Sequence, residues 1–131
     1  MLGIDTKVVV RLLITDDAEQ ARRARKLVQD AVRRDEPVLV SLPVLIETEW
    51  VLRSRYGLDR AAVTGVFRAA LETRELSFED EPAFEEALVQ WQDSACGFAD
   101  CLIAAHNRRL GCRATATFDI KAARLPGTVL A

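Results

Sequence analysis

Short apolar stretches alternate with longer amphipathic stretches along the chain. Residues 2–4 and 38–40 are brief apolar runs, typical of strands buried in a parallel sheet. Residues 113–118 and 128–130 are also strand-like. Residues 8–14 are apolar and β-branched, and periodicity alone does not decide between a strand and a buried helix there.

The longer stretches carry the helical period. Capping acids, prolines and glycines mark their ends, and these signals predict helices over 17–34, from Ser41 and Pro43 to about Arg55, from Asp59 past Leu71, from Asp80 and Pro82 past Trp91, and over 98–110. Because strands alternate with helices, we predict an α/β fold in which helices cover both faces of a mostly parallel sheet.

Length and composition fit one globular domain over residues 1–131, since 50% of the residues are hydrophobic and 29% are charged. No apolar run is long enough to span a membrane, and no basic segment precedes the first apolar run as in a signal peptide. The cysteines, Cys96, Cys101 and Cys112, are odd in number and have neither metal-site nor disulfide spacing. We therefore expect free thiols and a cytoplasmic location.

The net charge of −2 does not by itself indicate binding to nucleic acid. The basic residues are nearly all arginine, and they cluster at 22–26, 33–34, 53–55 and 108–109. Most of these clusters are interpreted as solvated helix faces. Arginine nevertheless suits phosphate, because its guanidinium can donate two parallel hydrogen bonds.

Four acidic residues stand out by their positions: Asp5, Glu47, Asp100 and Asp119. Asp5 and Asp119 each follow a predicted strand directly, and ligands of open α/β sheets bind beyond the carboxyl ends of the strands. Glu47 lies on the helix after the second strand, and Asp100 opens the helix before the third long strand. Carboxylates gathered in one place repel one another unless a cation neutralises them, and an all-oxygen set favours Mg²⁺ or Mn²⁺.

Each acid also has a purely structural interpretation. Asp5 and Asp119 fit as caps of a helix and a turn, Asp100 fits the first turn of a helix, and Glu47 fits an exposed helix face. Helical periodicity does not separate Glu47 from Glu49, because both flank the apolar face. Taken together, with two acids at strand ends, the four residues favour a metal site.

Four segments in series resemble the motifs of bacterial PIN-domain toxins of the VapC type. They are residues 2–11, residues 41–47 with 50–53, residues 97–105, and residues 117–119 with 123–127. The resemblance covers essentially the whole chain. It implies a three-layer α/β/α sandwich with a central parallel sheet, metal-dependent cleavage of RNA, a homodimer, and a cognate antitoxin that blocks the acidic pocket.

The resemblance also implies roles for particular residues. It assigns Mg²⁺ or Mn²⁺ binding to Asp5, Asp100 and Asp119, and it selects Glu47 over Glu49 as the fourth catalytic acid. Thr6 and Thr117 would orient the carboxylates or a water molecule through hydroxyl hydrogen bonds.

Two positions depart from the family pattern. Lys7 stands where the family usually has asparagine, and Gly97 stands where it often has an extra acid. Both changes make the surroundings of the site less negative. Lys7, together with Arg11, is a candidate contact to substrate phosphate. The same departures support an alternative, namely a PIN-fold interaction module that has lost its activity.

Other classes of protein fit less well. Asp16 and Asp17 follow an apolar run, as the acidic pair of a receiver-like phosphoacceptor domain would, but no phosphoacceptor aspartate follows a strand near the middle of the chain. Glycine-rich phosphate loops and nucleophile elbows are absent. Trp50, Trp91 and residues 8–14 provide either core packing or a surface for a second copy or an antitoxin segment.

Overall fold

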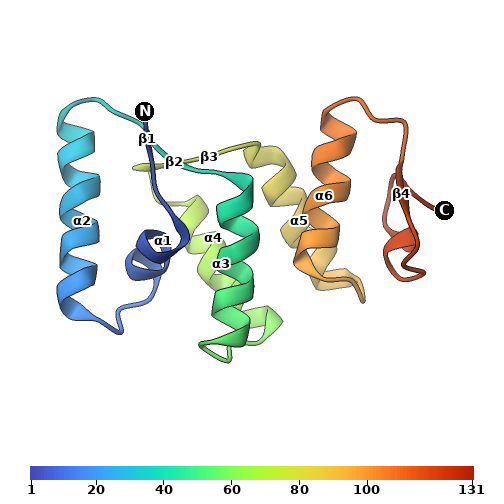
Figure 1. Ribbon diagram of the computed structural model, residues 1–131, viewed down its shortest axis with the longest axis horizontal. Coiled ribbons are helices and arrows are strands. Elements are labelled where there is room, and N and C mark those ends of the chain that lie inside the picture. The colour runs from blue at the N-terminus through green and yellow to red at the C-terminus, as the bar shows by residue number, and fades with distance from the viewer. The chain divides into compact units, whose positions relative to one another are not determined.

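The structure is a computed structural model that describes residues 1–131 (Figure 1). The residues form two compact units, Met1–Glu79 and Asp80–Ala131. Each unit has buried hydrophobic side chains of its own. The expectation of one domain over the whole chain stays a prediction.

Unit 1 contains a three-stranded parallel sheet and four helices. Its elements are β1 (Leu2–Gly3), α1 (Thr6–Leu13), α2 (Ala18–Arg33), β2 (Val38–Val40), α3 (Leu42–Ser54), α4 (Arg60–Leu71) and β3 (Leu76–Phe78). The strand order is β1-β2-β3, and in this register Leu2 lies beside Val38 and Val38 beside Leu76. Because all three strands run the same way, the helices that follow β1 and β2 begin at the same edge of the sheet.

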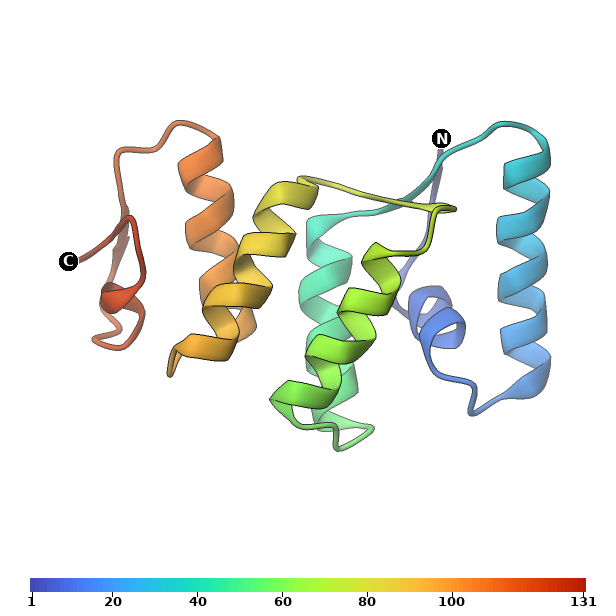
Figure 2. The same ribbon diagram turned by 180° about the vertical axis from the view of Figure 1, so that it is seen from behind.

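Residues 8–14, which the sequence left undecided, are helical except for the last. In Figure 1, α1 lies between α2 and α3, and it packs against both. Val9 and Val10 are its buried side chains, while the Arg11 side chain is partly exposed. Figure 2, seen from behind, shows α4 beside α3, with which it also packs.

The buried face of α2 is narrower than the sequence predicted. Leu27 and Val32 share the helical spacing of the apolar side chains of α2 but are 41% and 46% exposed. The helix instead buries mainly alanines, including Ala21, Ala24 and Ala31. Small residues let helices approach closely, and the bulkier side chains then remain at the flanks of the contact.

Unit 2 contains α5 (Glu81–Asp93), α6 (Phe98–Arg109), β4 (Thr115–Thr117), the short 3₁₀ helix η1 (Ala122–Arg124) and β5 (Thr128–Leu130). The two strands pair in parallel. Helices α5 and α6 lie side by side in both views (Figures 1 and 2). Phe98 joins them, because its ring meets Trp91 edge-on at 5.5 Å and Phe84 at 6.2 Å between centroids.

The predicted α/β class is confirmed, with parallel strands flanked by helices. Strand β3 was not predicted from the sequence. It is three residues long with the exposed Ser77 at its centre, so it lacks the apolar run that marks β2. None of the helices combines the length and the apolar character that crossing a bilayer requires.

Candidate functional site

Asp5 lies two residues after the end of β1 and is the N-cap of α1. Its Oδ1 atom accepts a hydrogen bond from the backbone N–H of Val8 at 3.1 Å, which satisfies one of the donors that a first helical turn leaves free. The side chain is exposed, and its other oxygen has no partner in the protein. Asp5 therefore caps a helix with one oxygen and keeps the second one available for a ligand.

The structure distinguishes Glu47 from Glu49 on α3. Glu49 is only 5% exposed, and its Oε2 atom accepts a hydrogen bond from Nε of Arg53 at 2.8 Å. Glu47 is exposed and takes part in no ion pair or hydrogen bond. Of the two candidates, Glu47 is thus the one whose carboxylate is free.

Asp100 lies in the first turn of α6 and is half-buried. Its Oδ2 atom accepts a long hydrogen bond, 3.4 Å, from the backbone N–H of Gly97. A Cβ atom at position 97 would lie 3.7 Å from that oxygen, so an acidic residue there would bring a second carboxylate close to Asp100. Glycine at this position leaves Asp100 without an acidic neighbour on the N-cap.

Asp119 begins the turn that follows β4. Its Oδ1 atom accepts hydrogen bonds from the backbone N–H groups of Lys121 and Ala122, at 2.8 and 3.2 Å. The Asp119 N–H donates in turn to the Thr117 hydroxyl at 3.0 Å, so Thr117 steadies the turn. Thr6 is buried at the start of α1, next to Asp5.

The four acids divide equally between the two units. Asp5 and Glu47 belong to unit 1, whereas Asp100 and Asp119 belong to unit 2. None of them forms an ion pair, and neither unit on its own gathers three or more Asp, Glu, His or Cys side chains that could hold a metal ion. That the four share one site stays a prediction.

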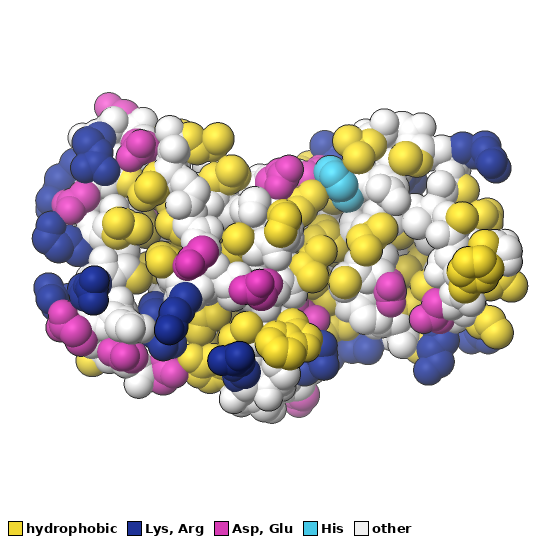
Figure 3. All heavy atoms as spheres, viewed as in Figure 1, with side chains coloured by type: hydrophobic (Ala, Val, Ile, Leu, Met, Phe, Trp, Pro, Cys, Tyr) yellow, Lys and Arg dark blue, Asp and Glu magenta, His cyan; other side chains and the backbone are white.

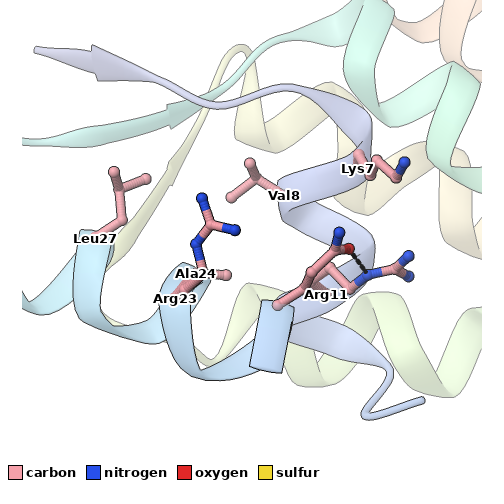
Figure 4. Close-up of a pocket in the computed structure, with 7 residues that line it drawn as sticks. Lys7, Val8, Arg11, Arg23, Ala24 and Leu27 are labelled. Carbon is pink, nitrogen blue, oxygen red and sulfur yellow. Dashed lines mark hydrogen bonds between the residues drawn. The ribbon is translucent and has the colours of Figure 1, made fainter. Parts of the chain in front are cut away.

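A basic pocket of about 310 Å³ lies between α1 and α2 in unit 1 (Figure 4). Apolar and cationic side chains line it together: Lys7, Val8, Arg11, Gln20, Arg23, Ala24 and Leu27. In Figure 4 the Arg23 guanidinium points into the space between the helices, and Lys7 stands at the edge. Figure 3 shows basic side chains gathered over α2.

Arg11 is held firmly at the base of this pocket. Its guanidinium donates to Gln20 at 2.5 Å, to the Tyr56 hydroxyl at 3.1 Å and to Asp16 at 3.3 Å. The Tyr56 hydroxyl donates to Asp16 at 2.8 Å; burial and this bond raise the pKa of Tyr56, although Arg11 opposes the shift. Lys7 and Arg23 have no such partners, so their charges remain available.

Sequence reasoning selected Lys7 and Arg11 but missed Arg23. The cluster of basic residues on α2 was interpreted as a solvated face, and for Arg22, which pairs with Glu19, that interpretation holds. The positions of Gln20, Arg23 and Leu27 do recur at helical spacing along one flank of α2. That spacing shows a shared flank, but only the packing against α1 shows that the flank lines a pocket.

Asp16 and Asp17 have structural roles. They follow helix α1 and not a strand, unlike the acidic pair of a receiver-like domain. Asp17 is the N-cap of α2, where its Oδ1 atom accepts from the Gln20 N–H at 3.0 Å. Asp17 is thus the capping acid at the start of the helix that the sequence predicted over 17–34.

A second cluster of charged groups links the ends of α5 and α6 in unit 2. The largely buried Asp80 carboxylate accepts hydrogen bonds from Nδ1 of His106, at 2.6 Å, and from Nε of Arg109. Burial favours the neutral acid, but the bonds from His106 and Arg109 outweigh it and hold the pKa of Asp80 below its ordinary value. Both basic groups bond to the one Asp80 carboxylate, so we interpret the cluster as a structural clamp.

The sequence model of the PIN domain family matches residues 3–127, a range that includes all four acids. Members of this family are generally nucleases, and PIN domains usually bind divalent metal ions. No curated protein matches the chain.

We predict that Asp80→Asn destabilises the protein by about 1.5–3 kcal/mol at pH 7, the usual contribution of a hydrogen bond to a charged group. Asparagine tolerates the left-handed backbone at residue 80, where φ is +51°, so the substitution isolates the loss of charge. Because the folded-state pKa is lowered, the contribution of the clamp is present above about pH 4 and is lost as the pH falls through that lowered value.

Urea unfolding at pH 7 and at pH 3 measures both parts of this prediction. Asp93→Asn, at the other end of α5, is the control, because Asp93 is exposed and unpaired. Equal stability of Asp80→Asn and the unsubstituted protein at pH 7 would contradict the clamp.

Proposed function

The chain belongs to the PIN domain family, and on that premise we propose that it is a metal-dependent endoribonuclease, an enzyme that hydrolyses phosphodiester bonds within RNA. The proposal names RNA as the substrate and Mg²⁺ or Mn²⁺ as the cofactor.

One observation carries the proposal. Asp5, Asp100 and Asp119 each use one carboxylate oxygen to accept backbone N–H groups, and each keeps the other oxygen free of protein partners. Free carboxylate oxygens are the donors that Mg²⁺ and Mn²⁺ prefer, so the chemistry of this donor set fits such a cation. A shared cation would also relieve the repulsion among the acids.

We propose a separate role for each of these residues. Asp5, Asp100 and Asp119 hold the cation, which when bound supplies Lewis-acid activation of the phosphodiester and of water. Glu47, whose carboxylate is unpaired, is free to accept the proton of the attacking water. Thr117 keeps the Asp119 turn in place through its hydroxyl, and Thr6 is proposed to do the same beside Asp5.

The basic pocket supports a polyanionic substrate. Lys7 lies two residues after Asp5, in the first turn of α1, where the helix dipole disfavours a cation. It is exposed and has no carboxylate partner, so a phosphate group would offset that unfavourable position. Arg23 offers a second free cation from α2, and Arg11 completes the basic lining while its own bonds fix its orientation.

We also propose that the protein is the toxin of a cytoplasmic toxin–antitoxin pair and that it acts as a homodimer. Phe118 and Ile120, on either side of Asp119, are 87% and 66% exposed. Exposed apolar side chains beside an acidic residue fit a partner segment that carries apolar and basic groups, as an inhibitory antitoxin would. All three cysteines are free thiols, in keeping with a reducing compartment.

We predict that the purified chain, freed of any antitoxin, cleaves structured RNA when Mg²⁺ or Mn²⁺ is added and stops when the metal is chelated. Asp5→Asn should lower the cleavage rate by more than about 100-fold, since even groups that only orient metal ligands contribute 10- to 100-fold. Its fold should be retained, because asparagine caps a helix as well as aspartate does.

Asp17→Asn is the matched control. It makes the same change at the N-cap of α2, outside the proposed site, and should leave cleavage unchanged. RNA that stays intact with either metal, while the protein is folded, would instead favour the inactive interaction module that Lys7 and Gly97 suggest.

We also predict that Lys7→Ala and Arg23→Ala each weaken the binding of single-stranded RNA in chelator. Each should reduce the slope of log affinity against log salt by about 0.7–1, the release of one counterion. Arg25→Ala removes the same charge from α2 but from a residue that does not line the pocket, and it should leave the slope nearly unchanged. Equal slopes for all three variants would rule out a specific phosphate contact in the pocket.

A further inference from the structure

The two tryptophans of the chain have opposite environments. Trp91 is 3% exposed and packs edge-on against Phe98, so it serves the core of unit 2. Trp50, on α3, is 48% exposed. A large aromatic side chain stabilises a fold mainly through burial, and the exposed half of the Trp50 indole contributes little in that way.

One cationic group, the Arg55 guanidinium, lies near the Trp50 ring. The guanidinium carbon of Arg55 lies 6.0 Å from the ring centroid, within range of a cation–π contact. Arg55 forms no ion pair, whereas the neighbouring Arg53 is bound to Glu49. Ser54 donates from its hydroxyl to the Trp50 carbonyl at 2.6 Å. The ring therefore stands beside a positive charge that no acidic side chain neutralises.

Trp50 also lies close to one of the proposed catalytic acids. Glu47 precedes it by three residues on the same helix, and residues three apart occupy the same helix face. The rise of an α-helix separates them by about 4.5 Å along the axis. Both side chains are exposed, so a strand bound on Trp50 would lie next to the Glu47 carboxylate.

We propose that Trp50 is a stacking platform for an unpaired base of the RNA substrate and that Arg55 contacts the phosphate next to that base. The inference rests on the proposed function, since it names the form of RNA that the site accepts. Proteins that bind single strands combine aromatic rings, on which bases stack, with arginine side chains that follow the backbone. Base-paired RNA is excluded from this contact, because its bases are already stacked.

The surroundings of Trp50 favour a nucleic-acid strand over a second protein. Trp50 is the only large hydrophobic side chain of α3 that is exposed, and the other exposed positions of the helix are Pro43, Glu47, Arg53 and Ser54. A docked helix needs an apolar stripe along several turns, and this face has none. A single ring with one unpaired arginine beside it suits one base and its neighbouring phosphate instead.

Fluorescence provides a direct test. In a Trp91→Phe variant of the full chain, Trp50 is the only tryptophan, and in EDTA the RNA is not cleaved. Titration with a single-stranded adenosine oligonucleotide should quench the emission in a saturable way, whereas a blunt RNA duplex of equal length should not. Binding that leaves the emission unchanged would overturn the proposal, as would failure to bind the single strand at all.

A second measurement does not depend on Trp91→Phe. By anisotropy of labelled single-stranded RNA in EDTA, Trp50→Leu in the otherwise unsubstituted chain should weaken affinity by about 5- to 100-fold, and Trp50→Phe should restore most of it, because a ring is what a base requires. In cleavage assays Trp50→Leu should raise KM more than it lowers kcat. Equal affinities of the leucine and phenylalanine variants would overturn the proposal.

These outcomes are separate from those of the proposed nuclease activity. Binding through Trp50 without any cleavage would support the stacking platform and contradict the nuclease activity. Cleavage by Trp50→Leu with an unchanged KM would support the nuclease activity and contradict the platform. Sedimentation identifies the competing occupant: if Trp50→Leu turns a dimer into a monomer with unchanged RNA affinity, a second copy covers the ring and the proposal is wrong.

Discussion

A carboxylate has two oxygen atoms, and at three of the four candidate positions the backbone holds one of them. A helix or turn that begins directly after a strand exposes N–H groups without partners, and an aspartate at that point accepts their hydrogen bonds. Asp5 does so for α1 and Asp119 does so for the turn after β4. The strand fixes where the side chain begins and the N–H group fixes where one oxygen lies. The direction of the remaining oxygen is therefore largely set before any ligand arrives.

The same four acids are free of ion pairs. Several other acidic groups form ion pairs, among them the surface pairs on α2 and the Asp80 clamp in unit 2. Asp5, Glu47, Asp100 and Asp119 form none. Conversely, Lys7, Arg23 and Arg55 carry positive charges without acidic partners, and all three lie in unit 1. Carboxylates gathered at one point would need a cation, and unpaired cations suit a polyanion. A metal-dependent nuclease would use both kinds of group on one substrate.

Much of the fold could be predicted from the sequence, because the element types follow from periodicity and end signals. The acids at strand ends were found in the same way, since Asp5 and Asp119 follow recognisable strands. Glu47 and Glu49 could not be separated by period, because both flank the apolar face. Arg53 separates them in the structure, and its position four residues after Glu49 was the available signal.

The features that the sequence did not predict arise from packing between elements. Strand β3 is formed by three residues with a polar centre, and it becomes a strand only through pairing with β2. In the sequence, Arg23 cannot be distinguished from the solvated arginines beside it. Only the packing of α2 against α1 shows that Arg23 lines a pocket between the two helices. Leu27, which shares the helical spacing of the apolar side chains of α2, lines that pocket. Trp50 was equally compatible with core and surface, and only its exposure in the structure resolves the question.

Central to the proposed function is one cation held jointly by Asp5, Asp100 and Asp119. Mn²⁺ titration followed by electron paramagnetic resonance tests this proposal most directly. Asp5→Asn removes a ligand from unit 1 and Asp119→Asn removes one from unit 2. The account predicts that each substitution alone weakens the tightest Mn²⁺ site by at least about tenfold, and that the double variant loses much less than the sum of the two free-energy changes. Tight Mn²⁺ binding that survives either substitution, or losses that simply add, would show that the two pairs of acids do not share a metal ion.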